Sequence, residues 1–406
     1  MSGGGDSAEP ARTGHETPAW AEPLEHERER SAALRELLVT RMAQRGGSLP
    51  FCDYMHAVLN EPGLGYYASG VSGFGAQGDF VTAPELSPIF AHCLANAIGP
   101  VLRQLGAHAH VLEVGAGSGA LAIGLLEALN ARGELPARYY IVEPSAHLQA
   151  VQRERLSEIE NRFGVPIQWV QTLDLDPFDG VVLANEVLDT LPVELFQMSA
   201  GLPYPVHVGA DGDVFFAQLG PHDHALTQWC NTLQRRLGWE FADDYRSERS
   251  GWVHGWLNSA QASLRRGSVV LIDYGYEERE YYHWERAQGT LMSYYRHRAH
   301  ADPFFLPGLQ DLTASVDFSA VASAAQALGL DIAGYTTQAW FLIGNEMAQM
   351  LEEFVGTERE YAQLAGAVRT LTLPGEMGER IKVIALNKDM DFELRGFADR
   401  DLRGRL

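Results

Sequence analysis

The sequence predicts an α/β fold built on a parallel, doubly wound sheet, and three observations carry this prediction. From about residue 110 to residue 170, short apolar segments alternate with amphipathic helical segments, the pattern of strands joined by crossover helices. A glycine-rich turn in VLEVGAGSGAL, Val111 to Leu121, follows the first apolar segment. Near the end of the chain, a helix and a strand precede a late strand, Ile381 to Leu386, which predicts a hairpin pair closing one edge of the sheet.

The N-terminal part is expected to lie outside this sheet. Residues 1–28 are rich in Gly, Pro, Glu and Ser, so we expect a disordered tail. Residues 29–80 are expected to form a helical and glycine-rich segment, because apolar residues recur at helical spacing before Gly46-Gly47. Another helix is expected from Thr82, where Pro84 and Glu85 add a first-turn proline and an acid.

The core of the fold is expected in two parts, residues 81–192 and residues 267–390. Its strands are expected in HVLEVGAG, RYYIVEP, PIQWVQTL, DGVVLANEVLD, GSVVLIDYG and DIAGYTTQAWFLI. Between the two parts, residues 193–266 break the rhythm with antiparallel strands around the turn GADGD and Trp-rich helices, which predicts an inserted α+β region on the substrate side. A long loop is expected at residues 276–315, and residues 391–406 are expected to form a C-terminal tail.

Composition narrows the classes of function. The chain has 53 acidic and 31 basic residues and a formal net charge of −22, which disfavours nucleic acid and membrane surfaces as partners. Three cysteines without CxxC spacing, and histidines without metal-ligand spacing, predict neither a disulfide framework nor a metal site. The N-terminus lacks the apolar region of a secretory signal and carries too many acids for a transit peptide, so we expect a cytoplasmic protein.

The glycine-rich turn is compatible with more than one ligand. Glycines after a buried strand let the backbone turn sharply and approach a ligand closely. Gly115, Gly117 and Ala120 also satisfy a dinucleotide-binding pattern, and a purely structural turn is a further alternative. Glu113, two residues before the first glycine, favours S-adenosylmethionine, because a carboxylate suits a sulfonium and an ammonium better than a pyrophosphate.

Five motifs carry a resemblance to a known family. GDFVTAPELSPIF, VLEVGAGSGAL, VLANEVLDTLPVELF, LIDYGY and GLQDLTASVDF resemble, in this order, the MidA family of S-adenosylmethionine-dependent methyltransferases, over roughly residues 40–390. The resemblance implies a seven-stranded Rossmann-like, class I methyltransferase sheet with an insertion. Since the family includes the mitochondrial complex I assembly factor, it also implies methylation of an exposed arginine on a protein partner, with a respiratory complex subunit as one candidate.

The candidate cofactor residues lie at the ends of the expected strands and in the GDFVTAP loop. They are Thr82, Glu85, Ser87, Glu113, Gly115, Ala116, Gly117, Glu143, Pro144, Asp174, Leu175 and Asn185. We expect the glycine turn to contact the methionine part of the cofactor and Glu143 to bind the ribose. Asp174 or Leu175 is expected to flank the adenine, although an acid in LDLDPFDG is equally consistent with a turn.

The candidate catalytic residues are Glu186, Asp189 and His297. Glu186 follows the fourth strand, at the edge where ligands bind in open α/β sheets. An acidic site suits a guanidinium, which is always charged and pairs with carboxylates. Asp189 is the nearer partner for Glu186, and Glu194 is the alternative. His297 is a candidate base or substrate contact, and a packed or solvated histidine is its alternative.

Other functions stay open at the level of the sequence. A small-molecule O- or N-methyltransferase and a non-catalytic assembly chaperone would both keep the fold. A NAD-dependent dehydrogenase is the least consistent alternative, because of the acid before the glycines. The sequence does not fix the oligomeric state, and a homodimer is one option.

Overall fold

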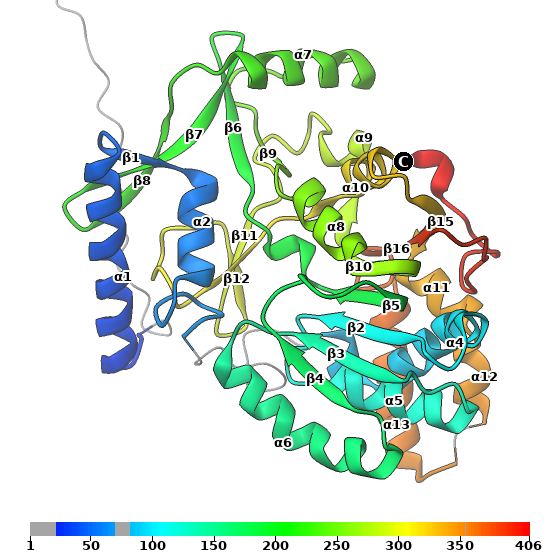
Figure 1. Cartoon of the computed structure of the whole chain (residues 1–406). Helices are drawn as coiled ribbons and strands as arrows, with labels where there is room; N and C mark the ends of the chain where they lie inside the picture. The colour runs from blue at the N-terminus through cyan, green and yellow to red at the C-terminus, as the bar shows by residue number, and fades with distance from the viewer. Residues whose placement is uncertain (1–21, 70–81, 354) are drawn as a thin grey trace, which may run out of the picture.

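A twisted sheet lies at the centre of the computed structural model, which describes residues 22–69, 82–353 and 355–406 (Figure 1). Its strand order is β15-β16-β10-β5-β2-β3-β4, and short β14 pairs with β10. The strands are β2 (His110–Val114), β3 (Arg138–Val142), β4 (Ile167–Val170), β5 (Phe178–Asn185), β10 (Leu264–Tyr276), β14 (Val316–Asp317), β15 (Asp331–Thr337) and β16 (Ile381–Lys388). Strand β16 runs antiparallel to both β10 and β15, so the predicted seven-stranded methyltransferase sheet with its closing hairpin pair is confirmed.

Helices cover both faces of this sheet, which explains why its strands are apolar on both sides. One apolar layer takes residues from α4 (Pro88–Leu105), α5 (Ala120–Arg132), α6 (Ala146–Phe163), α11 (Gln338–Gly344), α12 (Met347–Glu352) and α13 (Glu358–Thr372). The opposite layer takes residues from α8 (Val253–Ala262) and α10 (Phe318–Ala327). Helix α8 therefore packs on the central sheet, although it falls within the residues expected to form the insertion.

The N-terminal segment and the insertion share a second sheet. Its order is β1-β7-β6-β9, with β8 paired to β7. The strands are β1 (Ser48–Pro50), β6 (Glu194–Ser199), β7 (Leu202–Asp211), β8 (Val214–Leu219) and β9 (Arg246–Arg249). Helices α1 (Glu25–Gln44) and α2 (Phe51–Asn60) bury apolar residues against β6, β7 and β8. In Figure 1 the blue N-terminal helices lie beside the green strands of the insertion, and the two form one lobe.

Several predicted element boundaries differ from the structure. The expected tail 1–28 lies outside the described residues up to residue 21, and α1 already begins at Glu25. The expected helix from Thr82 is two helices, α3 (Ala83–Leu86) and α4, separated by Ser87. The expected strand DIAGYTTQAWFLI ends at Thr337, and its second half forms α11.

The expected loop 276–315 contains regular structure. After α9 (Glu278–Tyr281), a three-stranded sheet has the order β12-β11-β13. Its strands are β11 (Met292–Tyr295), β12 (Arg298–His300) and β13 (Asp311–Thr313). The expected C-terminal tail is also packed, because Leu394, Phe397 and Leu402 are buried and Leu402 N–H donates to the Tyr335 carbonyl at 2.7 Å.

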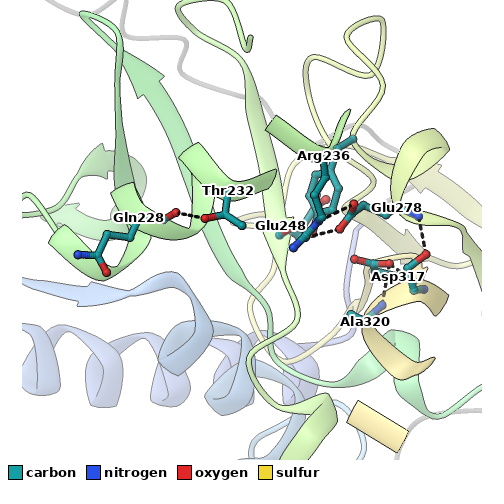
Figure 2. Close-up of polar contacts among 9 residues, drawn as sticks. Gln228, Thr232, Arg236, Glu248, Glu278, Asp317 and Ala320 are labelled. Carbon is teal, nitrogen blue, oxygen red and sulfur yellow. Dashed lines mark hydrogen bonds and ion pairs between the residues drawn. The ribbon is translucent and has the colours of Figure 1, made fainter. Parts of the chain in front are cut away.

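Polar contacts fasten the insertion to the second part of the core (Figure 2). Arg236, on α7 (His224–Leu237), pairs with Glu278 on α9 through Nη2 and Oε2 at 2.5 Å. Beside this pair, within the core itself, Asp317 caps α10 by accepting from Ala320 N–H at 3.1 Å. Glu248 of β9, 1% exposed, accepts from the backbone N–H groups of Thr290 and Leu291 at 2.8 and 3.0 Å. The lobe and the β11–β13 sheet are thus held in one arrangement around the carboxyl edge of the sheet.

No helix in the described part of the chain is both long enough and apolar enough to cross a bilayer.

Candidate active site

A cavity of about 360 Å³ opens at the carboxyl ends of β2, β3, β4 and β5. This is the edge at which open α/β sheets bind ligands, because the turns after the parallel strands meet there. Its walls come from the glycine turn after β2, the residues after β3 and β4, the end of β5, the α3 segment, and α8. The volume lies at the lower end of the range for small-molecule sites.

The glycine turn has the backbone that the sequence predicts. Gly115 and Gly117 have φ values of +67° and +53°, a region that residues with a Cβ rarely occupy. A Cβ on Gly115 would lie 3.2 Å from Cγ2 of Val187, so a side chain there would also crowd the opposite wall. Both glycines line the cavity, and α5 begins directly after the turn. The turn therefore brings bare backbone to the cavity surface.

Glu143, at the end of β3, is a buried carboxylate that lines the cavity. Its oxygens accept from Ser145 N–H at 2.9 Å and from Gln152 Nε2 at 3.1 Å. The same Gln152 donates to the Gly117 carbonyl at 2.9 Å and accepts from Trp169 Nε1 at 2.9 Å. Gln152, which no sequence pattern marks, thus fixes Glu143 relative to the glycine turn.

Glu113 also lines the cavity, but its charge is weaker than the sequence argument assumes. The side chain is 2% exposed and accepts from the Tyr139 hydroxyl at 2.7 Å. Burial raises the pKa of Glu113 to about 7, against the opposing effect of the tyrosine. Near neutral pH this carboxyl is only partly ionised, so the preference for a cationic ligand cannot depend on Glu113 alone.

The cavity brings together most of the predicted cofactor residues. Those that line it are Thr82, Glu85, Glu113, Gly115, Ala116, Gly117, Glu143, Pro144 and Asn185. Ser87 does not, because its Oγ caps α4 by accepting from Ile89 N–H at 3.2 Å. Asp174 and Leu175 do not either, and Gln171, Thr172 and Leu173 stand in their place. Strand β4 ends at Val170, so the residues directly after it reach the cavity and those further on do not.

Residues that are not among the predicted site residues complete the walls. They are Asn60, Tyr67, Ser118, Gln171, Thr172, Leu173, Thr190 and Trp256, together with apolar residues of the core. Asn60 and Tyr67 belong to the N-terminal segment, and Trp256 belongs to α8. No local pattern marks Asn60, Tyr67 and Trp256, because only the folded arrangement brings them to the sheet edge.

Glu186 lies at the end of β5, on the cavity wall. Its φ of +53° is unusual for a residue with a side chain, and its N–H donates to the Ile272 carbonyl at 2.8 Å. The following turn wraps around Asp273, whose Oδ2 accepts from the N–H groups of Val187, Leu188 and Asp189 at 3.1, 2.8 and 3.3 Å. Asp273 thereby holds Glu186 at the cavity.

Glu186 and Asp189 lie among other acids. Burial, and then the charge of Asp273, raises the pKa of Glu186 to about 8. Burial and the charges of Asp273 and Asp311 raise the pKa of Asp189 well above its usual range. The charged neighbours that act on Glu186 and Asp189 are carboxylates, so an added cation would be favourable here. Asp189 lies close enough to Glu186 for the Glu186 charge to help raise its pKa, whereas Glu194 pairs with Arg249 at 2.7 Å.

His297 does not fit the role of a base at this cavity. It is exposed, has a φ of +61°, and sits between β11 and β12 at the tip of a hairpin. It does not line the cavity. Within the described ranges, no group of three or more His, Cys, Asp or Glu side chains is arranged to hold a metal ion.

The residues present fit S-adenosylmethionine. The turn offers bare backbone to the methionine part, and buried Glu143 offers acceptors for ribose hydroxyls. The buried Oδ1 of Asn185 has no hydrogen-bond partner among the described residues, so an acceptor is available for an ammonium group. The sheet order and this cavity define a class I S-adenosylmethionine-dependent methyltransferase.

Comparison with known proteins agrees with this class. Residues 93–336 match the family model described as "Putative S-adenosyl-L-methionine-dependent methyltransferase", and the chain belongs to this family. A COG1565 superfamily member from Burkholderia thailandensis, solved with bound S-adenosyl-homocysteine, has a TM-score of 0.88 and 39% identity. The match covers 95% of this chain and 99% of that one. The family and the cofactor drawn from the motifs are therefore confirmed.

Curated relatives are more distant. The chain is 28% identical to the "Protein arginine methyltransferase NDUFAF7 homolog, mitochondrial" of Drosophila melanogaster, covering 84% of this chain and 82% of the relative. It is also 28% identical to the "Protein arginine methyltransferase NDUFAF7, mitochondrial" of Mus musculus, covering 84% and 81%.

Proposed function

We propose that the protein transfers the methyl group of S-adenosylmethionine to an arginine side chain of a protein partner. The observation that carries the proposal is the group of carboxylates beside the cavity, with Glu186 on its wall. A guanidinium remains charged at any physiological pH and presents a planar set of donors that carboxylates accept. The names of the curated relatives support the same acceptor.

The chain's own residues account for binding and orientation in such a transfer. When bound, the cofactor supplies an electrophilic methyl group, and the protein has to align the acceptor nitrogen with it. Glu186 is placed to accept from the acceptor guanidinium and so to localise its positive charge away from the attacking nitrogen. After the bond forms, the methylated nitrogen loses one proton, for which an ionised carboxylate is an acceptor.

The test uses labelled S-adenosylmethionine with the full chain and an extract depleted of endogenous cofactor. We expect label in protein, recovered as methylarginine after acid hydrolysis. Gly117→Val is expected to abolish labelling and to weaken S-adenosylhomocysteine binding by about 100-fold, because a side chain there fills space at the turn. Gly212→Val is the matched control, since Gly212 has a φ of +58° in the β7–β8 turn, outside the cavity.

Each contrary result points to a different function. Label confined to the low-molecular-weight fraction would identify a small-molecule acceptor. Tight binding of S-adenosylhomocysteine without any transfer would favour an assembly chaperone that keeps the fold. Normal cofactor binding by Gly117→Val would show that the glycine turn is not the cofactor site.

A further inference from the structure

We infer that an acceptor guanidinium binds in a chamber formed by Glu186, Asp189, Asp311 and Tyr67, and that Asp311 and Tyr67 are its specificity-determining pair. The inference rests on the proposed function and deepens it, because it assigns the recognition of the acceptor to residues outside the methyltransferase core. Tyr67 follows α2 in the N-terminal segment, and Asp311 begins β13.

Hydrogen bonds bring these two segments to the Glu186 turn. The Tyr67 hydroxyl donates to Asp311 Oδ1 at 2.8 Å, and Tyr67 lines the same cavity as Glu186. Just after β13, the Ala314 N–H donates to the Asp189 carbonyl at 2.9 Å. The four chamber residues thus converge from three parts of the chain that are far apart in sequence.

One carboxylate of the chamber lacks a partner. Asp189 is 7% exposed, and its buried Oδ1 has no hydrogen-bond partner among the described residues. Asp273, by contrast, is occupied by the N–H groups of the turn and of Tyr274. A buried carboxylate oxygen without a donor is costly, and a cationic donor would relieve that cost.

The arrangement favours a guanidinium over an ammonium. Glu186 lines the cavity, whereas Asp311 is fully buried and is joined to the cavity wall through its hydrogen bond with Tyr67, so the charge of a second carboxylate acts on the acceptor from a different segment. A guanidinium carries five N–H donors in a planar fork and can pair along two edges, whereas an ammonium is a compact point charge. Tyr294 is paired with Asp311 across β11 and β13, and Tyr274 follows Asp273, so aromatic rings add to the same surroundings.

Among the described residues, the charged groups that act on Glu186 and Asp189 are acids. On the core side they are Glu186, Asp189 and Asp273, and on the β13 side Asp311. The nearby phenols are Tyr67, Tyr274 and Tyr294. Arg380 is exposed, and its charge acts on Tyr294. Binding of a cation therefore favours ionised acids and is expected to release protons.

The test measures ethylguanidinium and n-propylammonium binding to the full chain saturated with S-adenosylhomocysteine. Titration calorimetry is expected to show ethylguanidinium binding about tenfold tighter than n-propylammonium, and tighter at pH 8.5 than at pH 6.5. Asp311→Asn and Tyr67→Phe are each expected to weaken the binding of ethylguanidinium by about tenfold. Each is also expected to reduce the ratio of the affinity for ethylguanidinium to that for n-propylammonium. Asp311→Asn is also expected to reduce the proton release, seen in buffers of different ionisation enthalpy. In Asp311→Asn, affinity for S-adenosylhomocysteine should stay unchanged, because Asp311 does not line the cofactor cavity. Exposed Glu285→Gln is the matched control.

The outcomes separate this inference from the proposed function. Equal binding of the two cations by the parent, or unchanged ethylguanidinium binding by both variants, would overturn the chamber. A merely structural role for the pair would lower the melting temperature and leave the preference and the proton release intact, which also counts against it. If ethylguanidinium binds as expected while no methylarginine is found in protein, the chamber stands and the proposed function fails.

Discussion

At the scale of single residues, Glu186 combines three features that each lower the stability of the folded protein. Its backbone is left-handed, its carboxyl is held among other acids, and its pKa is raised to about 8. Strained and charge-crowded residues of this kind cluster at functional sites, where the rest of the fold holds them in place. Here the four N–H groups that bind Asp273 do so, because they fix the turn on which Glu186 stands.

Glu186→Gln is expected to stabilise the ligand-free protein in a pH-dependent way. The carboxyl pKa rises from 4.5 to about 8 on folding, so below pH 4.5 the group is neutral in both states and costs nothing. Between those values the unfolded chain ionises first, and stability falls as the pH rises. At pH 8.5 the variant should gain about 2 kcal/mol in the free energy of unfolding, less than the full shift because the neighbouring acids share the charge.

Urea unfolding of parent and variant between pH 5 and pH 8.5 measures this difference. Glu285→Gln, which removes an exposed acid, should follow the parent at every pH. If the free energies of unfolding of parent and Glu186→Gln differed by the same amount at every pH, ionisation of Glu186 would not be the cause of the difference.

The site residues that could be predicted from the sequence lie next to predicted strands, and those that could not are brought together by contacts between distant parts of the chain. Gly115, Gly117 and Glu143 follow strands that the apolar pattern predicts, so their place at the sheet edge follows from the fold class. Tyr67 and Asp311 meet across 244 positions of the chain, and no local signal encodes such a contact.

At the scale of elements, the break between α3 and α4 shows how a cap shapes the cavity. The sequence predicts one helix with its cap at Thr82, but Ser87 has an extended backbone and starts α4 with its own Oγ. The break leaves α3 free to place Thr82, Pro84 and Glu85 on the cavity wall. A regular helix through Ser87 would not allow that placement.

Ser87→Ala is expected to separate capping from cofactor binding. Loss of the Oγ acceptor should lower the free energy of unfolding by about 1 kcal/mol, the usual cost of an N-cap. Because Ser87 does not line the cavity, S-adenosylhomocysteine affinity should change by less than about threefold. Chemical denaturation measures the stability and calorimetry measures the affinity. A tenfold loss of affinity would show that Ser87 takes part in cofactor binding after all.

Short elements were the least predictable from sequence. Strands β12 and β13 have three residues each, too few for an alternating pattern to be recognised. The β11–β13 sheet was therefore expected as part of a loop, although it supplies Asp311. The long strands and helices of the core carry enough periodic residues for their alternation along the chain to be predicted correctly.

At the scale of the whole molecule, the N-terminal segment and the insertion form one lobe beside the central sheet (Figure 1), and Asn60 and Tyr67 of the N-terminal segment line the cavity at the carboxyl edge of that sheet. The lobe and the β11–β13 sheet supply residues that the core lacks, and Glu248 and Arg236 help to hold them in place. In the proposed function, the core binds the cofactor, and the lobe contributes Tyr67 to the recognition of the acceptor.

Net charge is expected to govern how this whole surface meets its acceptor. With a formal charge of −22, the protein should attract a basic segment over long range. For an arginine peptide flanked by lysines, kcat/KM should fall several-fold between 50 and 500 mM salt, since the added ions screen the attraction. The same peptide with alanines for lysines is the control and should change little. Equal salt dependence of the two peptides would show that net charge does not steer the acceptor.

Strand β1 has a consequence for how the chain is made. Ser48 and His207, whose side chains meet at 3.1 Å, are 159 positions apart. The apolar faces of α1 and α2 are covered by β6, β7 and β8, which follow only after the first part of the core. During synthesis the N-terminal helices leave the ribosome well before these strands are translated, so their apolar side chains stay exposed to solvent in the meantime. A chaperone that shields nascent chains should therefore engage this protein early and release it once β7 has emerged.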